Sequence, residues 1–394
     1  MVQHPDHRSK RDRAIFKDLI LKRYLPVLFN ALTKCHMLIY LDAFSGPGIY
    51  EDGSMGSPLL AINTLVEFAK RVNISKQKEL IARVIFRFLE QDIEYFENLN
   101  SSITKLLSNL KKDGFNLDVE CFCEDAVRAL KEGIQALHKI DDTHPIAIFV
   151  YLDPWGLKGI ETDIVLEFLK LRNIKGYPVE LLLRFPPYLV VRFYKNSSMG
   201  PDWIKKILGL NPDELEEILS NEEKEERWEN VLKNYLSTIK KIYDSETGGN
   251  LYYTAIETLG SGQFYYMIFF TEHSYGLLKM NDSMTRTFAE RDIDFRLTNQ
   301  PLFTDSCRNK RGNFQFINKY IPKYSMDHPR YFIVQDEELH KYKGVPSLEE
   351  LVAKLTLDRF FAINPDVVKR KLRGLIDKER IGKTKAGVTP ILWP

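Results

Sequence analysis

Cysteine is scarce in this chain of 394 residues, and its four cysteines are not spaced as zinc-binding pairs. They are Cys35, Cys121, Cys123 and Cys307, and no two of them have CxxC spacing. A disulfide scaffold and a zinc ribbon are therefore not expected. Cys121 and Cys123 are expected to pack rather than to bind a metal.

The chain also lacks an excess of either charge and any long apolar run. Its 56 lysines and arginines face 54 acidic residues, which gives a net charge of +2 and excludes a chain that is basic throughout. The first residues contain no apolar secretory core, and stretches such as Ile146–Leu152 are too short to span a membrane. We expect a reduced, cytoplasmic protein with no membrane partner.

Short apolar stretches alternate with helical patterns over the first half of the chain. A helical pattern over Arg13–Leu32 comes first. Continuous apolar strands separated by helices are typical of a parallel sheet covered on both faces. The five predicted strands are Met37–Leu41, Val84–Leu89, Leu117–Phe122, Ile146–Leu152 and Val179–Phe185.

Two later stretches rich in tyrosine, phenylalanine and isoleucine, Leu251–Leu259 and Gln263–Thr271, predict an antiparallel hairpin that finishes the sheet. Met280–Phe288 predicts a further helix. The expected fold class is thus α/β, with a Rossmann-like, mostly parallel sheet.

Acidic residues follow the first four strands. They are Asp42, then Glu90 and Asp92, then Asp125, and finally Asp153. Ligands of such sheets bind beyond the carboxyl ends of the strands, and an unpaired buried carboxylate is costly. The pattern predicts a site for a polar ligand along this edge.

A glycine turn follows the first strand in the sequence DAFSGPG. Gly46 and Gly48 allow the backbone to approach a ligand closely, and Asp42 can accept a hydrogen bond from a ligand amine or ribose hydroxyl. The alternative is a simple glycine turn with no ligand.

The acids after the second and third strands each have two interpretations. Glu90 suits a contact to ribose hydroxyls, and Asp92 is the other candidate for the same contact. The alternative is that the residue is only an exposed acid at the end of a strand. Asp125 suits the exocyclic amine of an adenine, or else it caps a helix over Ala126–Leu137.

The fourth and fifth strands end in candidate substrate residues. Asp153, Pro154 and Trp155 lie where aminomethyltransferases carry an Asp/Asn-Pro-Pro-aromatic loop, although the second proline is missing here. Asp153 would accept from a target amine and Trp155 would stack on a base; the alternative is a turn with a core tryptophan. Arg184 suits a phosphate or carboxylate and Tyr188 suits stacking, unless both only pack.

The last part of the chain is basic. From Arg308 onward 18 lysines and arginines face 10 acids, which gives +8 and leaves −6 for the rest. A capping box at Ser347 and Glu350 and a helix over Val367–Lys378 with Lys369, Arg370 and Arg373 resemble a winged helix. We therefore expect a Rossmann-like domain over 1–300, with a helical insertion at about 200–245, and a basic winged-helix-like module over 301–394. A basic helical lid is the alternative.

Five segments together resemble one family. The DAFSGPG turn, the following GSP, the FLEQD strand end, FVYLDPWGL and YYMIFFTEHSYGLLKM look like the three-Cys-motif partner (TcmP) family over roughly residues 10–290. That family resembles class I S-adenosylmethionine-dependent methyltransferases and is paired with a three-cysteine, radical-SAM-like protein. The resemblance implies that Asp42, Phe44, Gly46 and Gly48 line the cofactor. It also implies Glu90 at the ribose, Asp125 near the adenine, and Asp153 with Trp155 facing the substrate.

The leading hypothesis is an S-adenosylmethionine-dependent methyltransferase that acts on nucleic acid, with a base amino group as target. Methyl transfer needs alignment more than catalytic groups, which suits a site without an obvious general base. A second hypothesis is a non-catalytic binding partner or scaffold for the radical enzyme. A third is a nuclease that uses Asp42, Glu90, Asp125 and Asp153 as metal ligands, although we expect no metal site.

Overall fold

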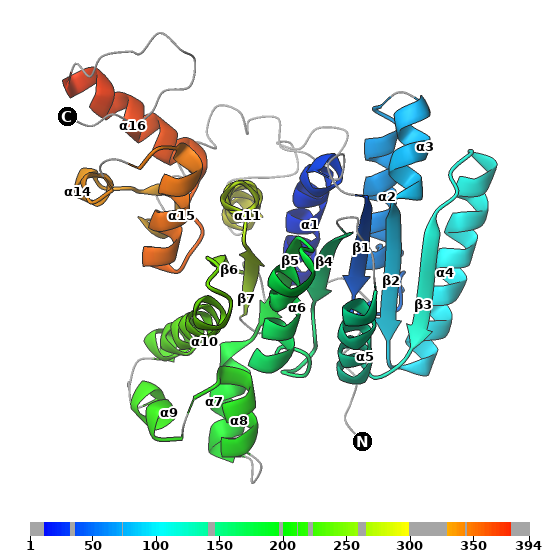
Figure 1. Cartoon of the computed structure of the whole chain (residues 1–394), viewed down its shortest axis with the longest axis horizontal. Helices are drawn as coiled ribbons and strands as arrows, with labels where there is room; N and C mark the ends of the chain where they lie inside the picture. Colours follow the sequence, from blue (N-terminus) through cyan, green and yellow to red (C-terminus); the bar gives the residue numbers. More distant parts are fainter. Residues whose placement is uncertain are drawn as a thin grey trace.

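The computed structural model describes residues 12–31, 36–72, 74–140, 146–196, 200–210, 212–219, 224–258, 265–298, 329–342 and 345–379. Seven strands of this part form one sheet in the order β3-β2-β1-β4-β5-β7-β6 (Figure 1). The strands are β1 (Met37–Asp42), β2 (Val84–Glu90), β3 (Asp118–Cys123), β4 (Ile146–Leu152), β5 (Val179–Phe185), β6 (Tyr252–Glu257) and β7 (Tyr266–Thr271).

The predicted fold class is confirmed. The first five strands pair in parallel, and β7 pairs antiparallel with both β5 and β6. The central strand β4 is buried along its whole length, as its continuous apolar sequence predicts. Strand β3 is half exposed instead, because it lies at the edge of the sheet and carries Asp118 and Glu120 on its outer side.

Helices cover both faces of the sheet. On one face α1 (Asp12–Ala31) packs between α2 (Ser57–Ala69) and α11 (Ser274–Thr298). On the other, α5 (Ala126–Lys139), α6 (Thr162–Lys175) and α10 (Lys224–Thr247) pack side by side. The remaining helices before residue 220 are α3 (Ile74–Ala82), α4 (Ile93–Lys112), α7 (Pro187–Asn196), α8 (Gly200–Leu208) and α9 (Pro212–Leu219).

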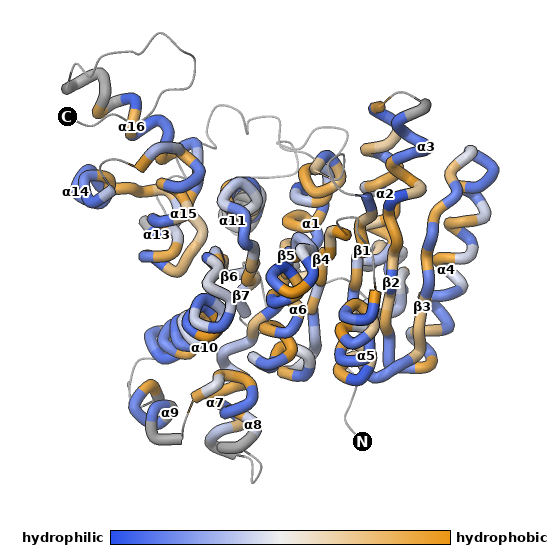
Figure 2. Tube along the Cα trace, viewed as in Figure 1, coloured by the Kyte–Doolittle hydropathy of each residue, from blue (hydrophilic) through white to orange (hydrophobic). Residues whose placement is uncertain are grey.

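The apolar stripes of these helices face the sheet, as Figure 2 shows by the hydrophobic colour along the strands and the inner helix faces. In α1 the buried residues follow helical spacing from Phe16 through Ile20 and Tyr24 to Leu28. The helix predicted over Met280–Phe288 is the middle of α11, which extends beyond it at both ends and buries Leu277 and Leu278 before the predicted start. None of the described helices is long and apolar enough to cross a lipid bilayer.

The C-terminal helices cover the β6 edge of the sheet. They are α13 (Pro329–Phe332), α14 (Asp336–His340), α15 (Leu348–Arg359) and α16 (Pro365–Glu379). Helix α15 packs on β6 and α11, and the Ala362 amide donates to the Ala255 carbonyl of β6 at 2.8 Å. An otherwise open strand edge is thereby covered.

A buried asparagine joins these helices to the sheet. Asn281 of α11 accepts from the Thr254 hydroxyl at 3.1 Å and from the Ile363 amide at 2.8 Å, and its amide group donates to the Thr356 hydroxyl at 3.3 Å. Ser347 caps α15 by accepting from the Glu350 amide, as predicted. The expected wing and the boundary near residue 300 lie outside the described residues, so the winged-helix module and the domain limits stay predictions.

The start of α11 provides a sharp test of packing. A Cβ atom on Gly276 would lie 2.6 Å from a carboxylate oxygen of Glu180 and 3.3 Å from the Thr271 hydroxyl. We expect Gly276→Ala to lower the free energy of unfolding by about 1–3 kcal/mol, measured by urea denaturation. The matched control is Gly133→Ala in α5, where a Cβ atom meets nothing within 4 Å. It should raise stability by up to about 1 kcal/mol through helix propensity. Equal effects at the two glycines would contradict this packing.

Candidate functional site at the carboxyl ends of β1 and β4

The site lies where the direction of the chain across the sheet reverses. From β1 the chain moves to β2 and β3 on one side, and from β4 it moves to β5 on the other. Strands β1 and β4 are parallel neighbours with Asp42 opposite Tyr151, so their carboxyl ends lie side by side. Open α/β sheets bind ligands at such a switch point.

Asp42 ends β1 and holds the turn that follows. It is completely buried, and its two carboxylate oxygens accept from the Phe44 amide at 3.2 Å and the Ser57 hydroxyl at 2.6 Å. Burial raises the pKa of Asp42 to about 7, against the lowering effect of these hydrogen bonds. The structure thus gives Asp42 an internal role in fixing the turn to α2, and its predicted contact with a cofactor stays a prediction.

The two predicted glycines of the turn have different surroundings. Both have positive φ, +65° at Gly46 and +77° at Gly48. A Cβ atom on Gly48 would lie 3.0–3.1 Å from methyl groups of Leu99 and Leu59, so this glycine packs the turn against α4 and α2. No atom of the described residues would lie within 4 Å of a Cβ atom on Gly46, so of the two glycines Gly46 is the one that leaves space beside the turn.

Glu90 ties this turn to the end of β2. Its carboxylate accepts from the Gly46 amide at 2.8 Å and from the Asp92 amide at 2.9 Å, and burial raises its pKa. Asp92, the competing candidate, caps α4 by accepting from the Tyr95 amide at 3.1 Å. Of the two acids, Glu90 is therefore the one that contacts the glycine turn.

Asp125 and Phe44 lie on the neighbouring loops. Asp125 caps α5 by accepting from the Arg128 amide at 3.0 Å, so its structural alternative is confirmed, and Lys158 lies 3.6 Å from its other oxygen. A contact with adenine stays a prediction. Phe44 packs against Gly159, where a Cβ atom would lie 2.8 Å from the ring, and it thereby connects the loops after β1 and β4.

Asp153 lies beyond β4 between two cations. Lys17 of α1 forms an ion pair with one of its oxygens, and Nε of Arg184 lies 3.9 Å from the other. The guanidinium of Arg184 also donates to the carbonyl oxygen of Pro154. The side chains are only 13% exposed in Lys17, 16% in Asp153 and 8% in Arg184, so this cluster is largely shielded from solvent.

Trp155 follows directly and is 59% exposed. The alternative of a core tryptophan is therefore wrong. The turn that holds it ends in the buried Leu157, so the loop gains its packing from that leucine and leaves the indole at the surface. An exposed aromatic ring next to a polar cluster presents part of its surface to solvent, where a base could contact it.

Sequence reasoning missed Lys17 and Tyr265. Arg184, at the end of β5, lies with its guanidinium 4.4 Å from the centre of the Tyr265 ring, and Lys17 lies 5.9 Å from it. Tyr265 immediately precedes β7, and the antiparallel pairing of Tyr266 with Phe185 brings it beside Arg184. The predicted hairpin pairing was the available signal for Tyr265. No signal indicated Lys17, which is separated from Asp153 by 136 residues.

The remaining predicted residues lie on α7 and α16. Tyr188 starts α7 and is half-buried against the core. Lys369, Arg370 and Arg373 are exposed on α16, at the β6 side of the molecule (Figure 1). Their contact with nucleic acid stays a prediction.

Each acid of the predicted ligand edge has a partner of its own, namely Ser57, the Gly46 amide, the Arg128 amide or Lys17. Within the described ranges, no group of three or more His, Cys, Asp or Glu side chains is arranged to hold a metal ion.

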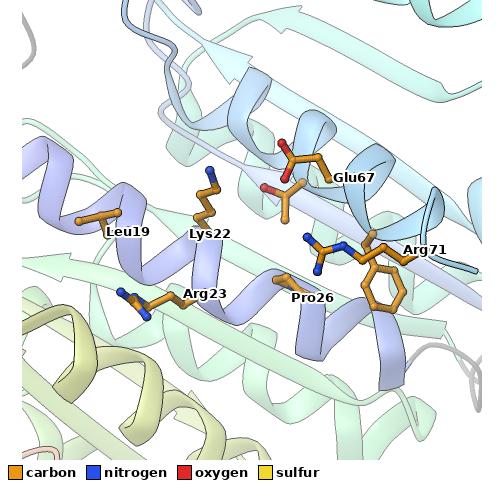
Figure 3. A pocket seen from close by; sticks show the side chains of 8 residues that line it. Leu19, Lys22, Arg23, Pro26, Glu67 and Arg71 are labelled. Atoms are coloured by element: carbon orange, nitrogen blue, oxygen red, sulfur yellow. The ribbon is translucent and has the colours of Figure 1, made fainter. Parts of the chain in front are cut away.

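A separate groove of about 400 Å³ lies on the outer faces of α1 and α2 (Figure 3). Lys22 and Pro26 of α1 line it together with Glu67 of α2 and Arg71, which lies just beyond the end of α2. These residues belong to the solvent side of both helices, whereas Lys17 reaches across α1 toward the sheet. The groove is therefore distinct from the site at β1 and β4.

The buried carboxylate of Asp42 predicts a pH dependence of stability. Since its pKa rises from 3.8 to about 7 on folding, the folded state binds the extra proton, and stability falls as pH rises from about 4 to about 7. Asp42→Asn should reduce this slope in urea denaturation series at several pH values. Glu180 lies at the other end of the strands, near the start of β5, and burial raises its pKa to about 7 as well. Glu180→Gln should therefore remove a separate part of the pH dependence of stability. An unchanged slope in both variants would contradict the burial of these groups.

No protein-family model matches the chain, and no curated protein matches it. Solved structures resemble it at low identity. A Legionella pneumophila protein of family DUF519, LPL1258, shares 14% identity, with 66% of this chain and 85% of that one covered and a TM-score of 0.37. An O-methyltransferase from Bacillus cereus in complex with SAH shares 12%, with 68% and 83% covered and a TM-score of 0.31. The O-methyltransferase TomG from Streptomyces achromogenes, in complex with SAM, shares 12%, with 64% and 78% covered and a TM-score of 0.29. Likenesses this distant establish neither a family nor a reaction for this chain.

Proposed function

We propose that this protein is an S-adenosylmethionine-dependent methyltransferase that acts on an amino group of a nucleic-acid base. The observation that carries the proposal is the meeting of two loops at the switch point of the sheet. The loop after β1 holds the glycine turn, which Glu90 at the end of β2 contacts, and the loop after β4 holds Asp153 and the exposed Trp155. A cofactor side and a substrate side thereby lie at the same edge.

The cofactor side fits a nucleoside that carries an amino acid group. Gly46 leaves space beside the backbone, and Glu90 offers a carboxylate that can accept from ribose hydroxyls. Asp42 fixes the turn through its hydrogen bond from Ser57, and Gly48 packs the turn against α2 and α4. When bound there, S-adenosylmethionine supplies an electrophilic methyl group.

The substrate side needs little chemistry beyond positioning. Asp153 would accept a hydrogen bond from the amino group, which orients the nitrogen lone pair, and Trp155 would stack on the displaced base. The exposed Lys369, Arg370 and Arg373 on α16 would contact phosphates and make the affinity depend on salt. Nucleic acid is thus the proposed substrate class.

A non-catalytic binding partner is the second candidate. Lys17 pairs with one oxygen of Asp153 and Arg184 donates to the Pro154 carbonyl, so two of the acceptors that an amine could use are occupied, which favours this candidate. Such a protein would hold S-adenosylmethionine or a related nucleoside as a scaffold for a radical-SAM-like enzyme, the partner that the TcmP resemblance implies.

Binding of the cofactor can be tested at Gly46. Asparagine tolerates positive φ, so Gly46→Asn should fold but fill the space beside the turn. We expect it to weaken S-adenosylmethionine binding at least about tenfold in calorimetric titrations. The matched control is Gly53→Asn in the same loop, which also has positive φ and open space around it and should bind as the wild type does.

Two results would contradict the proposal. A folded wild-type protein that takes up neither S-adenosylmethionine nor S-adenosylhomocysteine has no such site. Equal losses of affinity in the Gly46 and Gly53 variants would place the ligand elsewhere.

A further inference from the structure

Two buried polar atoms in the cluster next to the Trp155 loop have no hydrogen-bond partner among the described residues. They are Oδ1 of Asp153 and Nε of Arg184, and both are shielded from solvent. The two atoms lie 3.9 Å apart, which is too long for a direct hydrogen bond. Leaving a buried donor and a buried acceptor unpaired costs free energy, so a site that keeps both is expected to pair them with something else.

The two atoms have opposite hydrogen-bonding character. Nε of an arginine can only donate, and a carboxylate oxygen can only accept. A group that pairs both atoms at once must therefore accept on one side and donate on the other, with its two polar atoms next to each other.

The orientation of Arg184 is fixed by its other contacts. Its guanidinium lies over the Tyr265 ring and donates through a terminal nitrogen to the Pro154 carbonyl, and the side chain is only 8% exposed. Asp153 is held on its other oxygen by Lys17. The unpaired donor and the unpaired acceptor are thus held side by side. Selective recognition of a ligand needs such a rigid arrangement.

We infer that Arg184 and Asp153 together read an amidine edge, that is, an amino group next to an unprotonated ring nitrogen. The inference rests on the proposed function and specifies its substrate. Asp153 accepts from the amino group to be methylated, and Arg184 donates to the neighbouring ring nitrogen. Adenine and cytosine carry this pair on their Watson–Crick edge, whereas uracil and thymine carry no amino group.

Arg184 is in this account a specificity-determining residue, and lysine cannot replace it. The ammonium group of lysine is a single point of charge on a flexible stem, whereas Arg184 uses a terminal nitrogen for Pro154 and Nε for the base.

The test compares nucleosides that differ at the ring nitrogen alone. Affinities of the full-length protein for adenosine, 1-deazaadenosine, cytidine and 3-deazacytidine are measured by calorimetry, with and without S-adenosylhomocysteine. We expect the wild type to bind adenosine or cytidine about 5- to 150-fold more tightly than its deaza counterpart. Arg184→Lys should bind the two members of that pair equally.

The control is Arg172→Lys, at the exposed end of α6, which should keep the discrimination of the wild type. Circular dichroism establishes that each variant is folded, and the wild-type comparison stands by itself if Arg184→Lys does not fold. The inference is overturned if the wild type binds neither natural nucleoside, binds the deaza forms equally well, or if Arg184→Lys still discriminates. Binding of S-adenosylhomocysteine without nucleoside discrimination counts against this inference alone, whereas loss of S-adenosylhomocysteine binding counts against the proposed function.

Discussion

The parallel pairing of β1 with β4 is the constraint on which the rest of the site depends. The end of β1 at Asp42 and the start of β4 at Ile146 are 104 positions apart in the sequence. Their register nevertheless places Asp42 beside Tyr151 and brings the loops that follow the two strands together. The Ala43 amide then donates to the Tyr151 carbonyl at 3.1 Å, and the Ser45 amide donates to the Leu89 carbonyl at 2.9 Å. The glycine turn is thus attached to the strands on both sides of β1.

Burial has different consequences for the carboxylates gathered at this edge. Asp42 is sealed in the interior, where its hydrogen bonds from Ser57 and Phe44 lower the cost of the charge and a raised pKa of about 7 remains. Asp153 lies between Lys17 and Arg184, so cations balance its charge. Asp42 therefore supports the turn, whereas Oδ1 of Asp153 accepts no hydrogen bond from the described residues.

Much of the fold could be predicted from the sequence because strand and helix patterns are local. The apolar run of β4 and the hairpin after residue 250 identify the sheet, and the acids at strand ends predict a ligand site at one of its edges. The candidate site was harder to predict from the sequence, because its ion pairs join segments that are distant along the chain. Lys17 looks like an ordinary polar position of α1, and only the packing of that helix brings it to Asp153. Exposure of Trp155 likewise depends on which residue of its loop fills the core.

The proposed function requires that a methyl group passes from a nucleoside bound at the glycine turn to an amino group bound at Asp153. The direct measurement is transfer of a labelled methyl group from S-adenosylmethionine to total RNA and DNA by the wild type and by Asp153→Asn. We expect the wild type to place the labelled methyl group on amino groups of bases, and Asp153→Asn to transfer far less of it. Wild-type protein that binds the cofactor but labels no nucleic acid, or equal labelling by the variant, would contradict the proposed function.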